Sequence, residues 1–415
     1  MKQWVPSLAW LYRKPGRRKR RAFKASPPVI LSGGFACLIL LGTLLLKIPG
    51  ATEQPITWLE SLFTATSAVT VTGLVVVDTG ATYSVFGLTV LAVLIQAGGL
   101  GFMTFAVLAA MSLGGHVGLQ HQLMAKEAMH QTSLANIGRT AKAVVSLALT
   151  VEAVAVVGLT LTWWGDKGFV DALSEAVFYA ISAFNSAGFV LSPNGLVDYA
   201  SSIPVNLIVS ILFVIGGLGF SVITNIAEKR RWHDFSVYTR AILIATLIIN
   251  VLSVAIIWLL EMNNPATFAN LSIGDQAMAA WFQATTPRSA GFNTVDTGAM
   301  TEASAVFTLL LMLIGGGSMS TAGGIKLGTF IVLLVATYAF LRRREHVTLL
   351  NRTVPQEIVM KALAVTLVTL TLMFLGIFIL PYCRCYCRKS GSISIFNVCR
   401  PCWATDIGLF FSDAA

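Results

Sequence analysis

Long apolar runs alternate with short polar connections along most of the chain. Each run is long enough for a helix that crosses a hydrocarbon layer about 30 Å thick. The run at 143–165 contains one charged residue, Glu152, and the run that begins at 303 passes Lys326 before it continues to 341; the others are free of Asp, Glu, Lys and Arg. The pattern predicts seven transmembrane spans. They cover 28–46, 83–113, 143–165, 203–227, 241–260, 303–325 with its continuation to 341, and 362–381.

Composition excludes an ordinary soluble domain. Of the 415 residues, 55% are hydrophobic and only 12% are charged, and the mean hydropathy is +0.75. The fold class is therefore an all-α integral membrane protein. A basic segment at 13–24 precedes the first run, and no small-residue cleavage site follows that run, so no cleavable signal peptide is expected. Residues 1–27 are expected to form a cytoplasmic arm held against anionic lipid headgroups, with no nucleic-acid partner.

The distribution of charge predicts the topology. Basic residues are concentrated in the connections expected in the cytoplasm, and acidic residues in the other connections, in accordance with the positive-inside rule. The N-terminus is therefore expected in the cytoplasm. The basic set is the N-terminal arm, Lys126, Arg139, Lys142, Lys229–Arg231, Arg342–Arg344 and Arg352. The acidic set is Glu53, Glu60, Asp78, Asp166, Asp171, Glu175, Asp198, Glu261, Asp275, Asp296 and Glu302.

The outer connections contain an internal repeat. Each holds an apolar stretch too short to cross a membrane, at 56–70, 172–186 and 275–287, which predicts a re-entrant helix. Related motifs end these stretches: SAVTVTGL at 67–74, SAFNSAGF at 182–189 and TTPRSAGF at 285–292. The glycines in these motifs are Gly73, Gly188 and Gly291.

A second motif recurs at a similar distance after each copy of the first. QAGGLGF at 96–102, VIGGLGF at 214–220 and LIGGGSM at 313–319 follow the three loop glycines at similar distances. The repeating unit is therefore a span, a re-entrant helix, a glycine loop and a second span, as in a pseudo-symmetric pore. The expected division of the chain is 28–113, 114–228, 229–345 and 346–415, with the fourth repeat incomplete.

Backbone chemistry gives these loops a role. Irregular backbone cannot face lipid, because each unpaired N–H or C=O group costs several kcal/mol, so the loops must face protein or a water-filled path. Carbonyl oxygens directed inward would replace the hydration shell of a cation, and glycine allows the dihedral angles that aim them. Close helix packing is the alternative interpretation, and we favour it for the GGLGF segments at 98–102 and 216–220.

These loops, together with IGGGSMSTAGGIK at 314–326, resemble the TrkH/KtrB family of potassium uptake proteins, and within it the KtrB branch. The resemblance covers about 30–380. It implies four repeats around a central potassium path, each of which donates one strand of a selectivity filter. It also implies that potassium is the substrate and that no cofactor is bound directly. The filter residues it implies are Val71, Thr72, Gly73, Ser186, Ala187, Gly188, Ser289, Ala290 and Gly291.

The same resemblance assigns a gate to the interruption at 314–326, here called the intramembrane loop. In the family, the second membrane helix of the third repeat is broken below the filter, and its loop crosses the cavity. Glycines would make this loop mobile, and hydroxyl groups would satisfy its freed backbone groups. The matching residues are Gly315, Gly316, Gly317, Ser318, Ser320, Thr321, Gly323, Gly324 and Lys326.

Three charged residues within the apolar regions have two interpretations each. Glu152 near mid-span is a functional candidate by default, and pairing with a polar group of the bundle is equally consistent. Lys326 either tunes cation passage or extends towards cytoplasmic water. Arg288 either touches the ion or fixes the filter loop through carbonyl hydrogen bonds, and we favour the second role.

The C-terminal quarter departs from the repeat. Five cysteines stand where a pore helix is expected, and their spacing does not match a standard four-ligand zinc site. We interpret 383–402 as a local disturbance of the reading frame. The segment ATDIGLFF at 404–411 then supplies a fourth filter loop with Ile407 and Gly408, although no eighth span follows. A truncated, non-functional pore chain is one alternative. The cysteines are Cys383, Cys385, Cys387, Cys399 and Cys402.

Other function classes fit less well. An enzyme is disfavoured because all five histidines lie in cytoplasmic connections and no carboxylate pairs occur within spans. A sodium-coupled carrier with alternating access, or a channel for another cation, is the alternative, so sodium coupling stays open. The resemblance implies a homodimer in the bacterial cytoplasmic membrane that docks on a cytosolic ring of nucleotide-binding regulatory subunits of the KtrA type. No Rossmann fingerprint occurs in the chain, so nucleotide sensing would belong to that partner.

Overall fold

The computed structural model describes residues 27–101, 137–229, 231–288, 290–318, 320–344, 346–350 and 352–389. Several predicted features lie outside these residues. They are the basic arm before residue 27, the cytoplasmic connection 114–136, Ser289, and the segment from 390 onward with Ile407 and Gly408.

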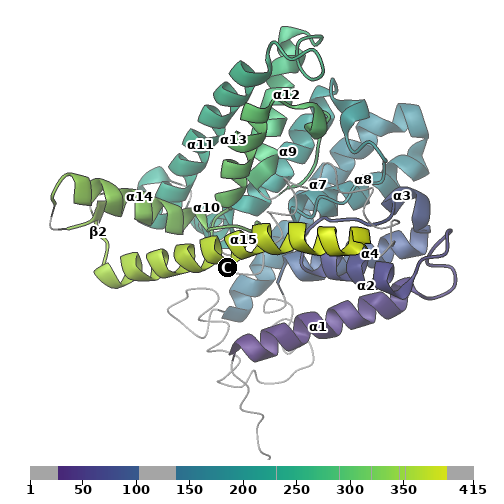
Figure 1. Cartoon of the computed structure of the whole chain (residues 1–415), viewed down its shortest axis with the longest axis horizontal. Coiled ribbons are helices and arrows are strands. Elements are labelled where there is room, and N and C mark those ends of the chain that lie inside the picture. Colours follow the sequence, from purple (N-terminus) through teal and green to yellow (C-terminus); the bar gives the residue numbers. More distant parts are fainter. Residues whose placement is uncertain are drawn as a thin grey trace, which may run out of the picture.

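The described chain is mostly helical (Figure 1). The helices are α1 (Pro27–Leu46), α2 (Trp58–Val69), α3 (Thr79–Thr82), α4 (Val85–Gly99), α7 (Ile137–Lys167), α8 (Phe169–Phe184), α9 (Ile203–Leu218), α10 (Phe220–Glu228), α11 (Val237–Glu261), α12 (Ile273–Thr285), α13 (Glu302–Leu313), α14 (Leu327–Leu341) and α15 (Gln356–Lys389). Short 3₁₀ turns are η3 (Val197–Tyr199), η4 (Trp232–Asp234), η5 (Thr286–Arg288) and η6 (Thr297–Ala299). Strands β1 (Thr348–Leu349) and β2 (Arg352–Thr353) pair antiparallel.

Three described helices are long and apolar enough to cross a membrane. These segments are Ala143–Lys167, Val237–Glu261 and Gln356–Gly376. The pair α9 and α10 would form a fourth span and is bent by 94°. Shorter apolar helices lie in α1, α4, α13 and α14, so the predicted seven full-length spans are not all reproduced in the described residues.

Each of three long helices packs against a short helix that follows it in the chain. The pairs are α1 with α2, α7 with α8, and α11 with α12. The short helices have 12, 16 and 13 residues, which matches the predicted re-entrant stretches. Polar residues start two of them: Thr57 and Glu60 form a capping box on α2, and Ser272 caps α12.

Two of the predicted spans are broken. The run 203–227 bends at Gly219, whose φ of 90° lies in the region that favours glycine. The run 303–341 is divided into α13 and α14 by the intramembrane loop. From α14 the chain turns through β1 and β2 and returns as α15, which packs against α14 (Figure 1). The helix α15 continues past the predicted end of its span at 381 as far as Lys389.

Candidate functional site

The loops after α2, α8 and α12 each contain a glycine with positive φ. We call residues 70–74, 185–189 and 288–292 the first, second and third glycine loops. Their glycines all have positive φ, at 79° for Gly73, 67° for Gly188 and 75° for Gly291. Val71 and Ser186, two residues before the glycine, also have positive φ, at 56° and 57°. Residues other than glycine rarely adopt this conformation, so the surrounding structure must hold both loops in place.

The three glycine loops meet. A Cβ atom built on Gly73 would lie 2.3 Å from the carbonyl oxygen of Ala187, and one built on Gly188 would lie 2.9 Å from that of Ala290. A Cβ on Gly291 would lie 3.4 Å from the Cα of Gly188. Loops from widely separated parts of the sequence therefore lie against one another, with no room for a side chain at Gly73 or Gly188.

Hydrogen bonds tie each loop to the short helix before it. The backbone N–H of Thr72 donates to Ser67, and that of Ala187 donates to Ser182, at 2.9 and 2.8 Å. The Ser182 hydroxyl also donates to the carbonyl of Phe189, at 2.9 Å. In the third loop, Thr286 makes the same kind of bond to the carbonyl of Phe292, at 2.7 Å. The second and third loops are therefore also held at the residue that follows the glycine.

The GGLGF segments bring α4 and α9 close to these short helices. A Cβ on Gly98 would lie 2.0 Å from the carbonyl oxygen of Val69, and one on Gly216 would lie 2.0 Å from that of Phe184. Both carbonyls belong to the last residue of a short helix. This agrees with the packing interpretation for those two glycines, whereas Gly219 instead breaks its helix.

The intramembrane loop is folded onto the bend between α9 and α10. The N–H of Gly317 donates to the carbonyl of Gly217 at 2.8 Å, and Ile314 and Ile325 form a parallel bridge within the loop. The Ser318 N–H donates to the hydroxyl of Tyr238, at 2.8 Å. Hydrogen bonds thus hold the loop against α11 as well as against the bend.

The same loop reaches the second glycine loop. Thr321 donates to the carbonyl of Phe184 at 3.3 Å, and its hydroxyl lies 3.4 Å from that of Ser186. Of the predicted gate residues, Lys326 donates from Nζ to the carbonyl of Ala322 at 2.6 Å. This half-buried side chain turns back into the loop, contrary to the interpretation in which it extends towards cytoplasmic water.

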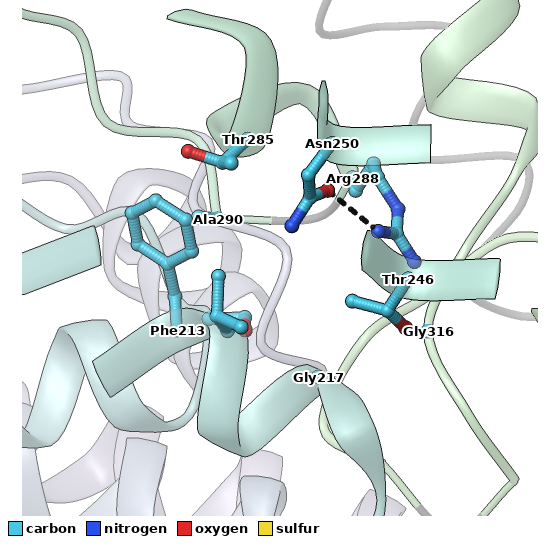
Figure 2. A pocket seen from close by; sticks show the side chains of 10 residues that line it. Phe213, Gly217, Thr246, Asn250, Thr285, Arg288, Ala290 and Gly316 are labelled. Carbon is cyan, nitrogen blue, oxygen red and sulfur yellow. Dashed lines mark hydrogen bonds between the residues drawn. The ribbon is translucent and has the colours of Figure 1, made fainter. Parts of the chain in front are cut away.

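A pocket lies between the glycine loops and the intramembrane loop (Figure 2). Its wall includes Ser186 and Ala290 from the glycine loops and Gly316 from the intramembrane loop. Arg288 also lines it, donating to Asn250 Oδ1 at 2.9 Å and to the carbonyl of Gly315 at 3.4 Å. Arg288 therefore bonds to a carbonyl, as the favoured interpretation predicted, and that carbonyl belongs to the intramembrane loop.

Glu152 is paired, as one of the two interpretations predicted. Gln96 Nε2 donates to both carboxylate oxygens of Glu152, at 3.0 and 3.1 Å, and Asn185 Nδ2 donates to Gln96 Oε1 at 2.6 Å. The sequence indicated no separate role for Gln96, Asn185, Asn250 or Tyr238. Gln96 and Asn185 belong to the repeated motifs at 96–102 and 182–189, whereas Asn250 and Tyr238 are marked only by a polar group within or beside an apolar run.

Residues 29–398 match the TrkH family of cation transport proteins. The chain belongs to this family. It is 44% identical over 355 residues to Ktr system potassium uptake protein B of Bacillus subtilis (strain 168), covering 86% of this chain and 80% of that protein. It is 38% identical over 364 residues to the protein of the same name from Vibrio alginolyticus, covering 87% and 80%.

The fold of this TrkH family chain also matches a solved structure. The crystal structure of the potassium transporter TrkH from Vibrio parahaemolyticus superposes with a TM-score of 0.69, at 21% identity, covering 87% of this chain and 73% of that one. The resemblance drawn from the sequence motifs is thereby confirmed at the level of family and fold. Apolar helices and family membership together identify a multi-pass membrane protein of a transporter family.

Proposed function

We propose that this chain is the pore-forming subunit of a Ktr-type system that takes up potassium across the bacterial cytoplasmic membrane. The observation that carries the proposal is the meeting of three glycine loops, in which a Cβ on Gly73 or Gly188 would collide with a carbonyl oxygen of the neighbouring loop. The choice of potassium as the transported ion rests on the relatives named Ktr system potassium uptake protein B. Carbonyl oxygens at such a junction suit a cation stripped of water, because they replace its hydration shell.

In this proposal the glycine loops form the selectivity filter. Its strands are residues 71–73, 186–188 and 289–291, with a fourth contributed by Ile407 and Gly408 in a fourth repeat. Each short helix directs its partly negative C-terminal end towards the loop that follows, which favours a cation there. The repeats are 28–113, 114–228, 229–345 and 346–415, arranged around one ion path, and the N-terminus lies in the cytoplasm.

The intramembrane loop is the proposed gate. It is stacked against the bend of α9 and α10, and Thr321 contacts the base of the second filter strand. Displacing the loop would open the pocket lined by Ser186, Ala290 and Gly316. A cytosolic ring of KtrA-type subunits is the proposed partner that drives this displacement, and the pore subunit is proposed to be a homodimer.

The test is rubidium uptake in a bacterial strain that lacks its own potassium uptake systems. Gly188→Ser and Gly291→Ser should weaken competition by potassium relative to sodium, because a side chain there disturbs the carbonyl positions. Gly33→Ser is the matched control, since Gly33 lies in α1 with no atom within 4 Å of the added Cβ. Unchanged ion competition in both filter variants would refute the filter assignment, and strictly sodium-dependent, saturable flux would indicate a carrier.

A further inference from the structure

A buried cluster of Glu152, Gln96 and Asn185 lies directly behind the second proposed filter strand. The three side chains come from α7, from α4 and from the residue that ends α8. Glu152 is 5% exposed and Asn185 is fully buried. Asn185 Nδ2 donates to Gln96 Oε1 at 2.6 Å and lies 3.5 Å from Glu152 Oε1, while Gln96 Nε2 donates to the carboxylate.

The carboxylate of Glu152 is satisfied by amides and by no cation in the described part of the chain. The ion pairs found there are Lys167 with Glu175 and Lys361 with Glu357. Burying a carboxylate in this way is costly unless its hydrogen-bond donors are held in place. The cluster therefore constrains the orientation of Gln96, and through it that of Asn185.

Asn185 controls the start of the filter strand. Its side chain also donates to the carbonyl of Ile181 at 2.9 Å, and the next residue is Ser186, in the left-handed region. A Cβ on Gly99 would lie 2.1 Å from Asn185 Oδ1, so α4 packs directly against this side chain. Little movement of Asn185 is allowed without a change in the backbone that follows it.

The equivalent positions of the other two loops are anchored differently. In the aligned motifs, Asn185 corresponds to Thr70 and to Arg288. Thr70 makes a local hydrogen bond to Thr66, whereas Arg288 bonds to Asn250 of α11. The three positions thus have different partners, and among the described residues only the second strand uses a buried carboxylate.

We propose that Glu152 is a positioning residue for ion selectivity, acting through Gln96 and Asn185 on the filter strand Ser186–Gly188. The inference rests on the proposed potassium filter and adds a residue from outside it. Discrimination between ions of similar charge needs ligand atoms held within about 0.5 Å. If the Asn185 side chain were held less firmly, the second strand could shift its carbonyl groups. Sodium would then pass the filter more readily.

Three variants separate hydrogen bonding from charge. Glu152→Gln places an amide donor against the Gln96 donor and should lower the potassium-to-sodium preference about fivefold, as expected for loss of a hydrogen bond of typical strength. Glu152→Asp keeps the charge but withdraws the carboxylate, and should shift the preference in the same direction. The exchange Gln96→Glu with Glu152→Gln restores the pattern, because the new carboxylate at position 96 accepts from Asn185 and from the new amide at position 152.

The measurement is rubidium uptake by the full chain with its regulatory partner, competed by potassium or sodium and normalised to folded protein in the membrane. Glu261→Gln is the matched control: Glu261 is also a fully buried carboxylate, but its partners lie outside the filter loops. We expect loss of preference in Glu152→Gln and Glu152→Asp, recovery in the exchanged pair, and unchanged preference in Glu261→Gln.

Two results would overturn the inference while leaving the filter intact. In the first, the wild type is potassium-selective, and the Glu152 variants keep the same ion preference and differ only in the amount of folded protein in the membrane. The other is an exchanged pair that stays as unselective as Glu152→Gln, because the route through Gln96 would then be wrong. A wild type without potassium-selective uptake would instead overturn the proposed function together with the inference.

Discussion

The hydroxyl of Thr321 donates a hydrogen bond of 3.3 Å to the carbonyl of Phe184, the last residue of α8. This bond links the intramembrane loop to the short helix that supports the second glycine loop. The carbonyls at the end of a helix lack partners within the helix, so an added donor is favourable there. Movement of the loop must break this contact, so the contact would couple the proposed gate to the proposed filter.

Replacing Thr321 by valine should favour the open state of the proposed gate. Valine has nearly the same shape but no hydroxyl, so the closed loop loses hydrogen bonds worth roughly 1 kcal/mol, or about fivefold in the open-to-closed ratio. Initial rates of potassium uptake in proteoliposomes without the regulatory partner should rise. Thr89→Val, on an exposed face of α4, is the control. A slower or unchanged rate in Thr321→Val would contradict the coupling.

Tyr238→Phe should act on the same loop from the opposite side. The Tyr238 hydroxyl accepts from the Ser318 N–H at 2.8 Å, and phenylalanine removes that acceptor. We expect a higher basal uptake rate, and a still higher rate when residues 318–322 are deleted. The double variant with Thr321→Val reports whether the two contacts act independently. If the single variant leaves uptake at the wild-type rate, this contact does not hold the gate closed.

Alanine should be tolerated differently at two of the filter glycines. Gly73 and Gly291 have similar φ values of 79° and 75°, so both variants carry the same backbone strain, about 1–2 kcal/mol. The added Cβ at Gly73 would meet the Ala187 carbonyl at 2.3 Å, whereas at Gly291 the nearest atom lies at 3.4 Å. Gly73→Ala should therefore lower both selectivity and thermal stability more than Gly291→Ala. Equal effects in competition and unfolding measurements would argue against the close approach of the first two loops.

The short helices and their loops could be predicted from sequence because the signal is local. The stretches 56–70, 172–186 and 275–287 are too short to cross a membrane and end in glycine motifs, and helices of 12, 16 and 13 residues occur there. The division of 303–341 was also visible, since glycines and hydroxyl residues interrupt an apolar run. Local composition is sufficient for such features.

The individual hydrogen bonds between distant elements could not be predicted, because they depend on which helices become neighbours. Gln96 and Glu152 are 56 residues apart in sequence and meet only because α4 and α7 both pack against α8. The bend at Gly219 was missed because its GGLGF motif resembles that at 98–102, which suits close packing. Arg288 was expected to bond to carbonyl groups, but the sequence did not indicate that the partner would lie in the intramembrane loop.

Glu261 should be a determinant of stability and not of selectivity. Its fully buried carboxylate accepts from Thr301 N and Oγ1 at 2.8 Å each, from Thr267 Oγ1 at 2.6 Å and from Asn264 Nδ2 at 2.8 Å. These bonds join the end of α11 to the segments before α12 and α13. Glu261→Gln turns one acceptor into a donor that faces other donors, which should cost about 2–4 kcal/mol of unfolding free energy.

Thermal unfolding in detergent measures that cost, with Glu302→Gln as the control. Glu302 is exposed in the first turn of α13, where loss of its charge should cost only about 0.3–1 kcal/mol. A large drop in the unfolding temperature of Glu261→Gln, with unchanged ion competition in the protein that remains folded, is the expected pair of results. An altered ion preference in this variant would mean that the outer connections also shape the filter, because no bond described for Glu261 reaches a glycine loop.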